Sequence, residues 1–313
     1  MKLSVQTFGT LEMIGLEKGM AAIAAAGFDA LDLGLDGFYK WEELSKGIKC
    51  GFFSDDNFYA YLDSVKAEAD KYGIEIGQVH APFPLFVPKS EQGSANVKED
   101  VAKSIAACSR LNCPRIVIHP IFDGSARYPS MTKEEEYKAN MEYYSSLIPL
   151  LKEHKVVCCL ENMWMQDSKT KKIYAGCCSD INETIRYIDE LNAIAGERLF
   201  GFCLDIGHLL LVGQDPCYWI EMLGDRLETL HTHDNNGVDD QHILPYLGCA
   251  NWERFVLGLR KIGYSRNFSF EVSCFNRKFP NELIPAALKF TADMGRYFIG
   301  RIEAETDPTD ENR

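Results

Sequence analysis

The chain alternates short runs of β-branched and other apolar residues with longer segments in which apolar residues recur every three or four positions. The first pattern predicts buried strands and the second predicts amphipathic helices. The predicted strands are Leu3–Phe8, Phe28–Leu33, Ile74–His80, Arg115–His119, Val156–Leu160, Phe200–Leu204, Leu227–Leu230 and Phe268–Val272. The predicted helices that follow them are Leu16–Ala26, Asp55–Tyr72, Val97–Leu111, Lys133–His154, Asp180–Ala193, Gln214–Leu223, Asn251–Ile262 and Glu282–Ile299.

Eight strands, each followed by a helix, match the count that closes a (β/α)₈ TIM barrel. The alternative is an open doubly wound sheet, which normally has a glycine-rich phosphate turn after its first strand. The stretch FGTLEMIG that follows the first strand does not fit that turn. We therefore expect one barrel domain over residues 1–300 and a disordered acidic tail over residues 301–313.

The charge of the chain limits its partners. A formal net charge of −13 and a pI near 5.1 disfavour binding to nucleic acid and to anionic membranes. The N-terminal segment has no signal-peptide core, and no apolar run reaches the length of a membrane span. The eleven cysteines form no CxxC pair, which favours a reducing cytosol and a cytoplasmic location.

Residues of metal-ligand type occur at the ends of six predicted strands. These residues are His80, His119, Glu161, Asp205, His231 and Glu271. In a parallel barrel the carboxyl ends of the strands converge on one face, where such barrels carry their chemistry. Carboxylates buried together there need a cation, and imidazole with carboxylate suits Zn²⁺ or Mn²⁺.

The segment from Leu227 to His242, LETLHTHDNNGVDDQH, carries the densest set of such residues. Taken alone, it also fits a polar loop with solvated histidines and a capping aspartate. We expect Asp234 to form hydrogen bonds within this loop.

Seven short motifs carry a resemblance to a known family. They are VHAPF at His80, IVIHP at His119, LEN at Glu161, LDIGH from Asp205 to His208, HTHDN at His231, DQH from Asp240 to His242, and FEVS at Glu271. Through them the chain resembles the xylose-isomerase-like superfamily of metal-dependent TIM barrels, especially its sugar phosphate isomerase/epimerase branch. That branch is similar to endonuclease IV-type AP endonucleases.

The resemblance implies one core divalent ion and as many as three ions in total. The core ligands it implies are Glu161, Asp205, His231 and Glu271. In the endonucleases two further zinc ions are bound, which here implies His80 with His119, and His208 with Asp240 and His242. His233 matches no ligand position, and Asp32 stands where relatives commonly have Glu.

The implied activity is metal-dependent isomerisation or epimerisation of a sugar, sugar phosphate or keto-polyol through an enediolate. Glu161 and Glu271 would transfer the proton, and His208 would either contact a substrate oxygen or belong to the third ligand set. The alternatives are a dehydratase with the same enolate chemistry, a zinc phosphoesterase of the AP endonuclease type, and a non-catalytic sugar-binding barrel. The expected partner is a small carbohydrate, and the sequence leaves open whether the chain forms a homo-oligomer.

Overall fold

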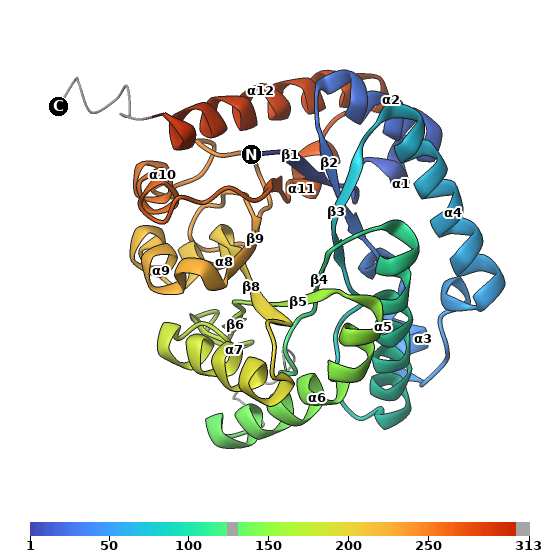
Figure 1. The fold of residues 1–313 in the computed structure, drawn as a ribbon, viewed down its shortest axis with the longest axis vertical. Helices are drawn as coiled ribbons and strands as arrows, with labels where there is room; N and C mark the ends of the chain where they lie inside the picture. The colour runs from blue at the N-terminus through green and yellow to red at the C-terminus, as the bar shows by residue number, and fades with distance from the viewer. Residues whose placement is uncertain (124–130, 305–313) are drawn as a thin grey trace. The chain divides into compact units, whose positions relative to one another are not determined.

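Eight strands form one sheet within residues 1–123 and 131–304, the residues that the computed structural model describes (Figure 1). The order in the sheet is β10-β1-β2-β3-β4-β5-β8-β9, so the last strand of the chain neighbours the first. β1 pairs in parallel with β10, and a parallel bridge from Thr232 to Phe270 joins the segment after β9 to β10. The predicted (β/α)₈ barrel is therefore confirmed. The strands are β1 (Leu3–Gln6), β2 (Ala30–Gly34), β3 (Glu75–His80), β4 (Arg115–Val117), β5 (Val157–Glu161), β8 (Phe200–Asp205), β9 (Leu227–His231) and β10 (Phe268–Phe270).

Helices occupy the segments between the strands. The α-helices are α1 (Leu11–Ile14), α2 (Leu16–Ala26), α3 (Trp41–Ser45), α4 (Asp55–Tyr72), α5 (Glu91–Leu111), α6 (Lys133–His154), α7 (Ile181–Ala195), α8 (Ile206–Leu211), α9 (Pro216–Leu223), α10 (Trp252–Lys261), α11 (Ser273–Asn276) and α12 (Ile284–Glu303). Short 3₁₀ helices cover Asp36–Phe38, Gly51–Phe53, Gly224–Arg226 and Asn281–Leu283. None of these described helices combines the length and the apolar composition that crossing a bilayer requires.

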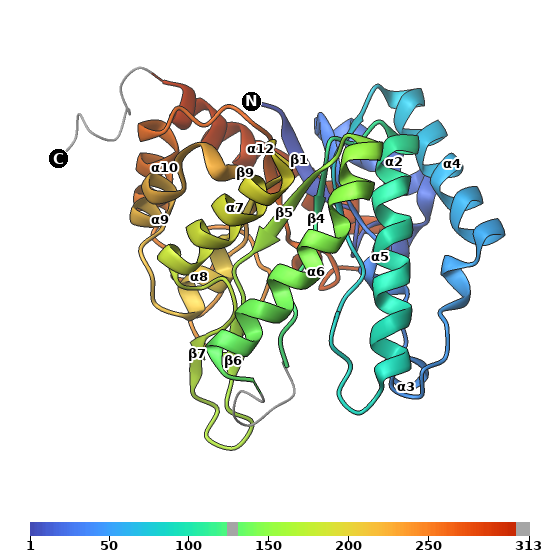
Figure 2. The ribbon, with the colours of Figure 1, turned by 60° about the horizontal axis from the view of Figure 1, so that its bottom comes forward.

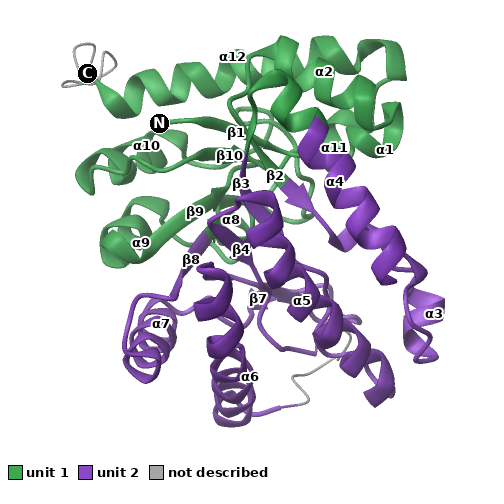
Figure 3. Cartoon of the chain, turned by 45° about the vertical axis from the view of Figure 1, so that its right-hand side comes forward, with its two compact units in different colours: residues 1–32, 68–75, 204–313 green, residues 33–67, 76–203 purple. Residues whose placement is uncertain are grey.

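The chain divides into two compact units, coloured separately in Figure 3. Unit 1 contains residues 1–32, 68–75 and 204–313, and unit 2 contains residues 33–67 and 76–203. The boundaries fall inside β2, α4, β3 and β8.

Unit 1 is held together by contacts between the two ends of the chain. α12 packs against α2 and β1 (Figure 1). A Cβ built at Gly295 of α12 would lie 2.3 Å from Leu3 Cδ1 and 2.8 Å from Phe270 Cε2. The glycine therefore lets the helix approach the neighbouring strands β1 and β10 closely.

In unit 2, α5 and α6 lie side by side, as Figure 2 shows. After β5 comes an antiparallel hairpin of β6 (Trp164–Gln166) and β7 (Ile173–Ala175), near the beginning of α6. The sequence pattern predicted no strand between Leu160 and Asp180, because strands of three residues are too short to show an alternation.

The C-terminal helix extends beyond the predicted barrel boundary. α12 ends at Glu303, and Arg301 is buried and forms two hydrogen bonds with Glu253, of 2.9 and 2.6 Å. This paired arginine keeps the last turn in the folded part of the chain. The predicted disorder of the tail from residue 305 onward lies outside the described residues.

α6 begins with a reciprocal cap that supports a stability prediction. The Thr132 hydroxyl accepts a hydrogen bond from the Glu135 N–H at 3.2 Å, and the Glu135 carboxylate accepts one from the Thr132 N–H at 2.8 Å. Thr132→Ala removes the first of these bonds and should lower the free energy of unfolding in urea by about 1 kcal/mol. Ser64→Ala, which removes an exposed hydroxyl inside α4, should leave it nearly unchanged. Equal effects of the two variants would contradict this role of the cap.

Candidate metal centre

The six strand-end residues singled out in the sequence lie where their strands end. His80, Glu161, Asp205 and His231 are the last residues of β3, β5, β8 and β9. Glu271 directly follows β10, and His119 lies two residues beyond β4. Their exposed fractions range from 0% to 8%, so each carboxylate must be compensated within the protein.

In unit 2, three of these residues form one group. His119 Nε2 lies 3.1 Å from Glu161 Oε2 and 3.2 Å from His80 Nε2. His80 Nε2 lies 3.9 Å from Glu161 Oε2. Two imidazoles and a carboxylate at these separations fit the ligand chemistry of Zn²⁺ or Mn²⁺.

In unit 1, a second group contains Asp205, His231 and Glu271. His231 Nδ1 lies 3.4 Å from Glu271 Oε2 and 3.9 Å from Asp205 Oδ2. The opposite ring nitrogen, Nε2, lies 3.1 Å from Oδ2 of Asp32. A carboxylate at that position favours a proton on Nε2. The lone pair of Nδ1 then faces the two remaining carboxylates, which is the arrangement a cation needs.

Glu271 is held in place by a residue that the sequence pattern did not single out. Gln6 Nε2 donates a hydrogen bond of 2.7 Å to Glu271 Oε1, and both side chains are buried. The register of β1 explains the contact, because Val5 pairs with Phe270 and Gln6 pairs with Asp32. The available signal is a polar residue at the end of a strand in which every residue is buried.

A third group, also in unit 1, contains His208, His233, Asp240 and His242. Asp240 Oδ2 lies 3.2 Å from His208 Nε2 and 3.1 Å from His242 Nε2. His208 comes from α8, whose N-cap is Asp205, and the other residues come from the segment after β9. The structure thus brings together the three residues that the resemblance implied as one ligand set, with His233 beside them.

The electrostatics of unit 1 suit a cation. Burial alone would lower the pKa of His242, but the Glu271 carboxylate and the hydrogen bond to Asp240 raise it to about 10. Burial raises the pKa of Asp240, yet the charges and hydrogen bonds of His208 and His242 hold it far below its usual value. In the metal-free protein, a proton on His242 therefore offsets the negative charge that a divalent ion would neutralise.

Asp234 anchors the loop that carries Asp240 and His242, as the sequence predicted. Its carboxylate accepts four hydrogen bonds. The donors are the backbone N–H groups of Asn235, Gly248 and Ala250, at 2.9 to 3.2 Å, and the indole N–H of Trp252, at 3.0 Å. These bonds tie both ends of the loop to one buried charge.

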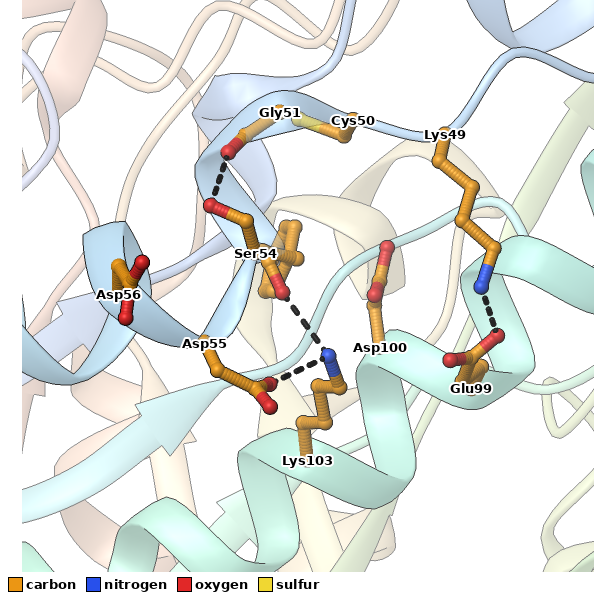
Figure 4. A pocket seen from close by; sticks show the side chains of 10 residues that line it. Lys49, Cys50, Gly51, Ser54, Asp55, Asp56, Glu99, Asp100 and Lys103 are labelled. Atoms are coloured by element: carbon orange, nitrogen blue, oxygen red, sulfur yellow. Dashed lines mark hydrogen bonds and ion pairs between the residues drawn. The ribbon is translucent and has the colours of Figure 1, made fainter.

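A separate cavity of about 560 Å³ lies in unit 2, and none of the predicted ligands line it (Figure 4). Its lining includes Lys49, Asp55 and Lys103, and Lys103 bonds to Asp55 at 2.9 Å. Asp100 of α5 also lines the cavity, is buried, and accepts a hydrogen bond of 2.7 Å from the Tyr39 hydroxyl. Burial raises the pKa of Asp100 to about 6, although the bond from Tyr39 and the charge of Lys103 lower it.

Comparison with known proteins identifies relatives in sequence. The family model described as xylose isomerase-like TIM barrel matches residues 20–294. The uncharacterized protein MJ1311 of Methanocaldococcus jannaschii is 28% identical over 269 residues, which cover 82% of this chain and 78% of that protein. The uncharacterized protein y4fM of Sinorhizobium fredii is 35% identical over 71 residues, which cover 23% of each chain.

Solved structures share the fold. A D-tagatose 3-epimerase-like protein is 21% identical, with a TM-score of 0.67 and coverage of 96% of this chain and 100% of that one. The 3-keto-D-glucoside 4-epimerase YcjR of E. coli is 15% identical, with a TM-score of 0.68 and coverage of 95% and 99%. The IolI protein, crystallised with a bound zinc atom, is 16% identical, with a TM-score of 0.71 and coverage of 97% and 100%.

The four bonds to Asp234 generate a prediction about the loop. Asp234→Ala leaves buried donors without an acceptor and should lower the free energy of unfolding by about 3 kcal/mol in urea denaturation. The control is Asp239→Ala, which removes an exposed carboxylate of the same loop that accepts a bond from Asn236. It should change the free energy by less than about 0.5 kcal/mol. A loss for Asp234→Ala no larger than for this control would contradict the anchoring role.

The raised pKa of Asp100 generates a pH prediction. Because its folded-state pKa of about 6 exceeds the ordinary 3.8, its stabilising contribution is complete below pH 3.8 and is lost as the pH rises through 6. Asp100→Asn should therefore raise the melting temperature relative to wild type more at pH 8 than at pH 5. Glu99→Gln, which removes the exposed carboxylate beside it, should show no such trend. A wild-type advantage that grows with pH would reverse the sign and refute the assignment.

Proposed function

Because this chain belongs to the xylose isomerase-like TIM barrel family, we propose that it is a divalent-metal-dependent isomerase or epimerase. Its substrate is a sugar, a sugar phosphate or a keto-polyol, and the reaction passes through an enediolate of that substrate. The epimerases among its structural neighbours support this choice of reaction class.

The observation that carries the proposal is the buried group of Asp205, His231 and Glu271. The imidazole nitrogen of His231 that faces two carboxylates is the atom suited to bind an ion. We propose Glu161 as the fourth ligand because it is the last residue of β5, and barrels of this kind carry their chemistry at the carboxyl ends of the strands. Zn²⁺ and Mn²⁺ both suit this set of donors, and the zinc atom in IolI favours zinc.

The ion would polarise the carbonyl group of a bound substrate and so make the neighbouring C–H more acidic. The protein then has to remove that proton and return it to the same or the adjacent carbon. Glu161 and Glu271 are the proposed bases, since carboxylates on two sides of a substrate allow removal and return on different faces. Gln6 keeps Glu271 in one orientation through its hydrogen bond to Oε1. His208, on α8, is the proposed contact to a substrate oxygen.

One observation favours a zinc phosphoesterase of the AP endonuclease type as a second candidate. His208, Asp240 and His242 form a compact group, and His80, His119 and Glu161 form another. They contain the additional zinc ligands that the resemblance implies, with the core ligand Glu161 in the second group. The net charge of −13 opposes this candidate, because a negative protein attracts a phosphate backbone poorly. A dehydratase would use the same proton abstraction, followed by loss of a leaving group at the next carbon.

The proposed reaction predicts exchange of a substrate C–H proton with solvent. Protein stripped with EDTA and reloaded with Mn²⁺ or Zn²⁺ should introduce deuterium beside the carbonyl of at least one ketose or keto-polyol in D₂O, as measured by mass spectrometry. Glu161→Gln and Glu271→Gln should each lose about 10²–10⁴-fold of this rate while still binding metal. Glu282→Gln, which changes an exposed glutamate before α12, is the matched control and should keep the rate.

His80→Ala separates the two candidates. It should cost little exchange activity if the core ion alone supports the reaction. Cleavage of duplex DNA at an abasic site in zinc, without exchange on any ketose, would instead establish the phosphoesterase.

A further inference from the structure

His233 belongs to none of the proposed ligand sets, yet it contacts a member of each set in unit 1. Its side chain is completely buried. Its Nε2 lies 3.0 Å from Oδ2 of Asp205, and its ring stacks on the ring of His242 with centroids 4.0 Å apart. We propose that His233 is a positioning residue, which donates a hydrogen bond to Asp205 and supports His242 without binding an ion itself. This inference rests on the proposed metal-dependent function.

Distance alone would allow His233 to serve as a ligand. One ligand atom from each of His208, His233, Asp240 and His242 lies within 4.8 Å of the others. The ring planes rule out one arrangement, in which His233 and His242 bind the same ion. An imidazole binds a metal along a lone pair in its own plane, whereas the stacked planes of His233 and His242 are only 13° from parallel. Two such planes do not converge on one nearby ion.

The hydrogen bond from His233 to Asp205 defines the tautomer of the ring. Because Asp205 offers only acceptor oxygens when ionised, the proton of the imidazole lies on Nε2. Nδ1 is buried and has no hydrogen-bond partner among the residues that the structure describes. His233 therefore donates to Asp205 through Nε2.

Asp205 is held through both of its oxygens. Oδ1 accepts the backbone N–H of His208 at 2.6 Å, as the N-cap of α8, and Oδ2 accepts the bond from His233. Two donors on opposite oxygens restrict rotation of the carboxylate. An ion then meets a ligand that is already oriented, so that less conformational entropy is lost when it binds.

The backbone leaves room for the His233 ring at one glycine. A Cβ built at Gly207 would lie 1.9 Å from His233 Cε1 and 2.4 Å from its Nδ1. Asn235 Nδ2 also donates to the carbonyl of Gly207 at 2.9 Å, which fixes the first turn of α8 against the segment after β9. The position of the His233 ring therefore depends on both α8 and the segment after β9.

The test is the affinity of EDTA-stripped protein for Zn²⁺ and Mn²⁺, measured by titration calorimetry. His233→Leu removes the donor and should weaken binding of the tightest ion about 10–100-fold with the stoichiometry unchanged. His233→Gln offers an amide N–H to Asp205 and should recover most of that loss. Gly207→Ala displaces the ring while keeping the histidine. As a single substitution it should weaken metal binding. In a double variant with His233→Leu it should weaken binding little beyond the effect of His233→Leu alone.

The outcomes distinguish this proposal from the one it rests on. Loss of one ion per chain in both His233 variants would make His233 a ligand and overturn the positioning role. Unchanged affinity in His233→Leu, with a lower melting temperature of the stripped protein, would leave it a structural residue only and also overturn the proposal. Wild-type protein that takes up no divalent ion would refute the proposed function itself, and the positioning role with it.

Discussion

The burial of several carboxylates close together is the constraint on which this structure depends. Asp32 in β2, Asp205 at the end of β8 and Glu271 directly after β10 are buried around His231 in unit 1. A buried carboxylate is unfavourable unless hydrogen bonds or an opposite charge compensate it. Imidazoles supply part of that compensation, and the raised pKa of His242 reflects how strongly the region attracts positive charge. A divalent ion would satisfy the same demand while ordering the side chains for chemistry.

The residues that orient the proposed ligands come from other elements than the ligands do. Gln6 on β1 holds Glu271, Asp32 on β2 faces His231, and the segment after β9 brings His233 to Asp205. Such contacts restrict each ligand to one orientation and select its tautomer. The proposed ligands are therefore oriented by specific contacts, and are not simply polar groups that happen to lie at strand ends.

The barrel by itself does not determine the reaction, because this architecture supports many unrelated activities. What distinguishes the candidates is the number of ions held and the charge around them. A core ion between carboxylates suits proton transfer on a small carbonyl substrate. Clustered zinc sites suit phosphate chemistry, but a chain with a net charge of −13 gives little long-range attraction for nucleic acid.

The sequence alone determined the elements whose signals are local. α2, α4 and α6 begin and end as predicted, since apolar periodicity and terminal signals lie within each segment. It also placed the histidines and carboxylates at strand ends, because a strand and the polar residue that ends it are contiguous. Only the tertiary structure decided which side chains support them. Gln6 and Glu271 are 265 positions apart, and they meet because parallel pairing sets β1 against β10 in one register. Pairing of that kind depends on the closed sheet as a whole, and no short stretch of sequence encodes it.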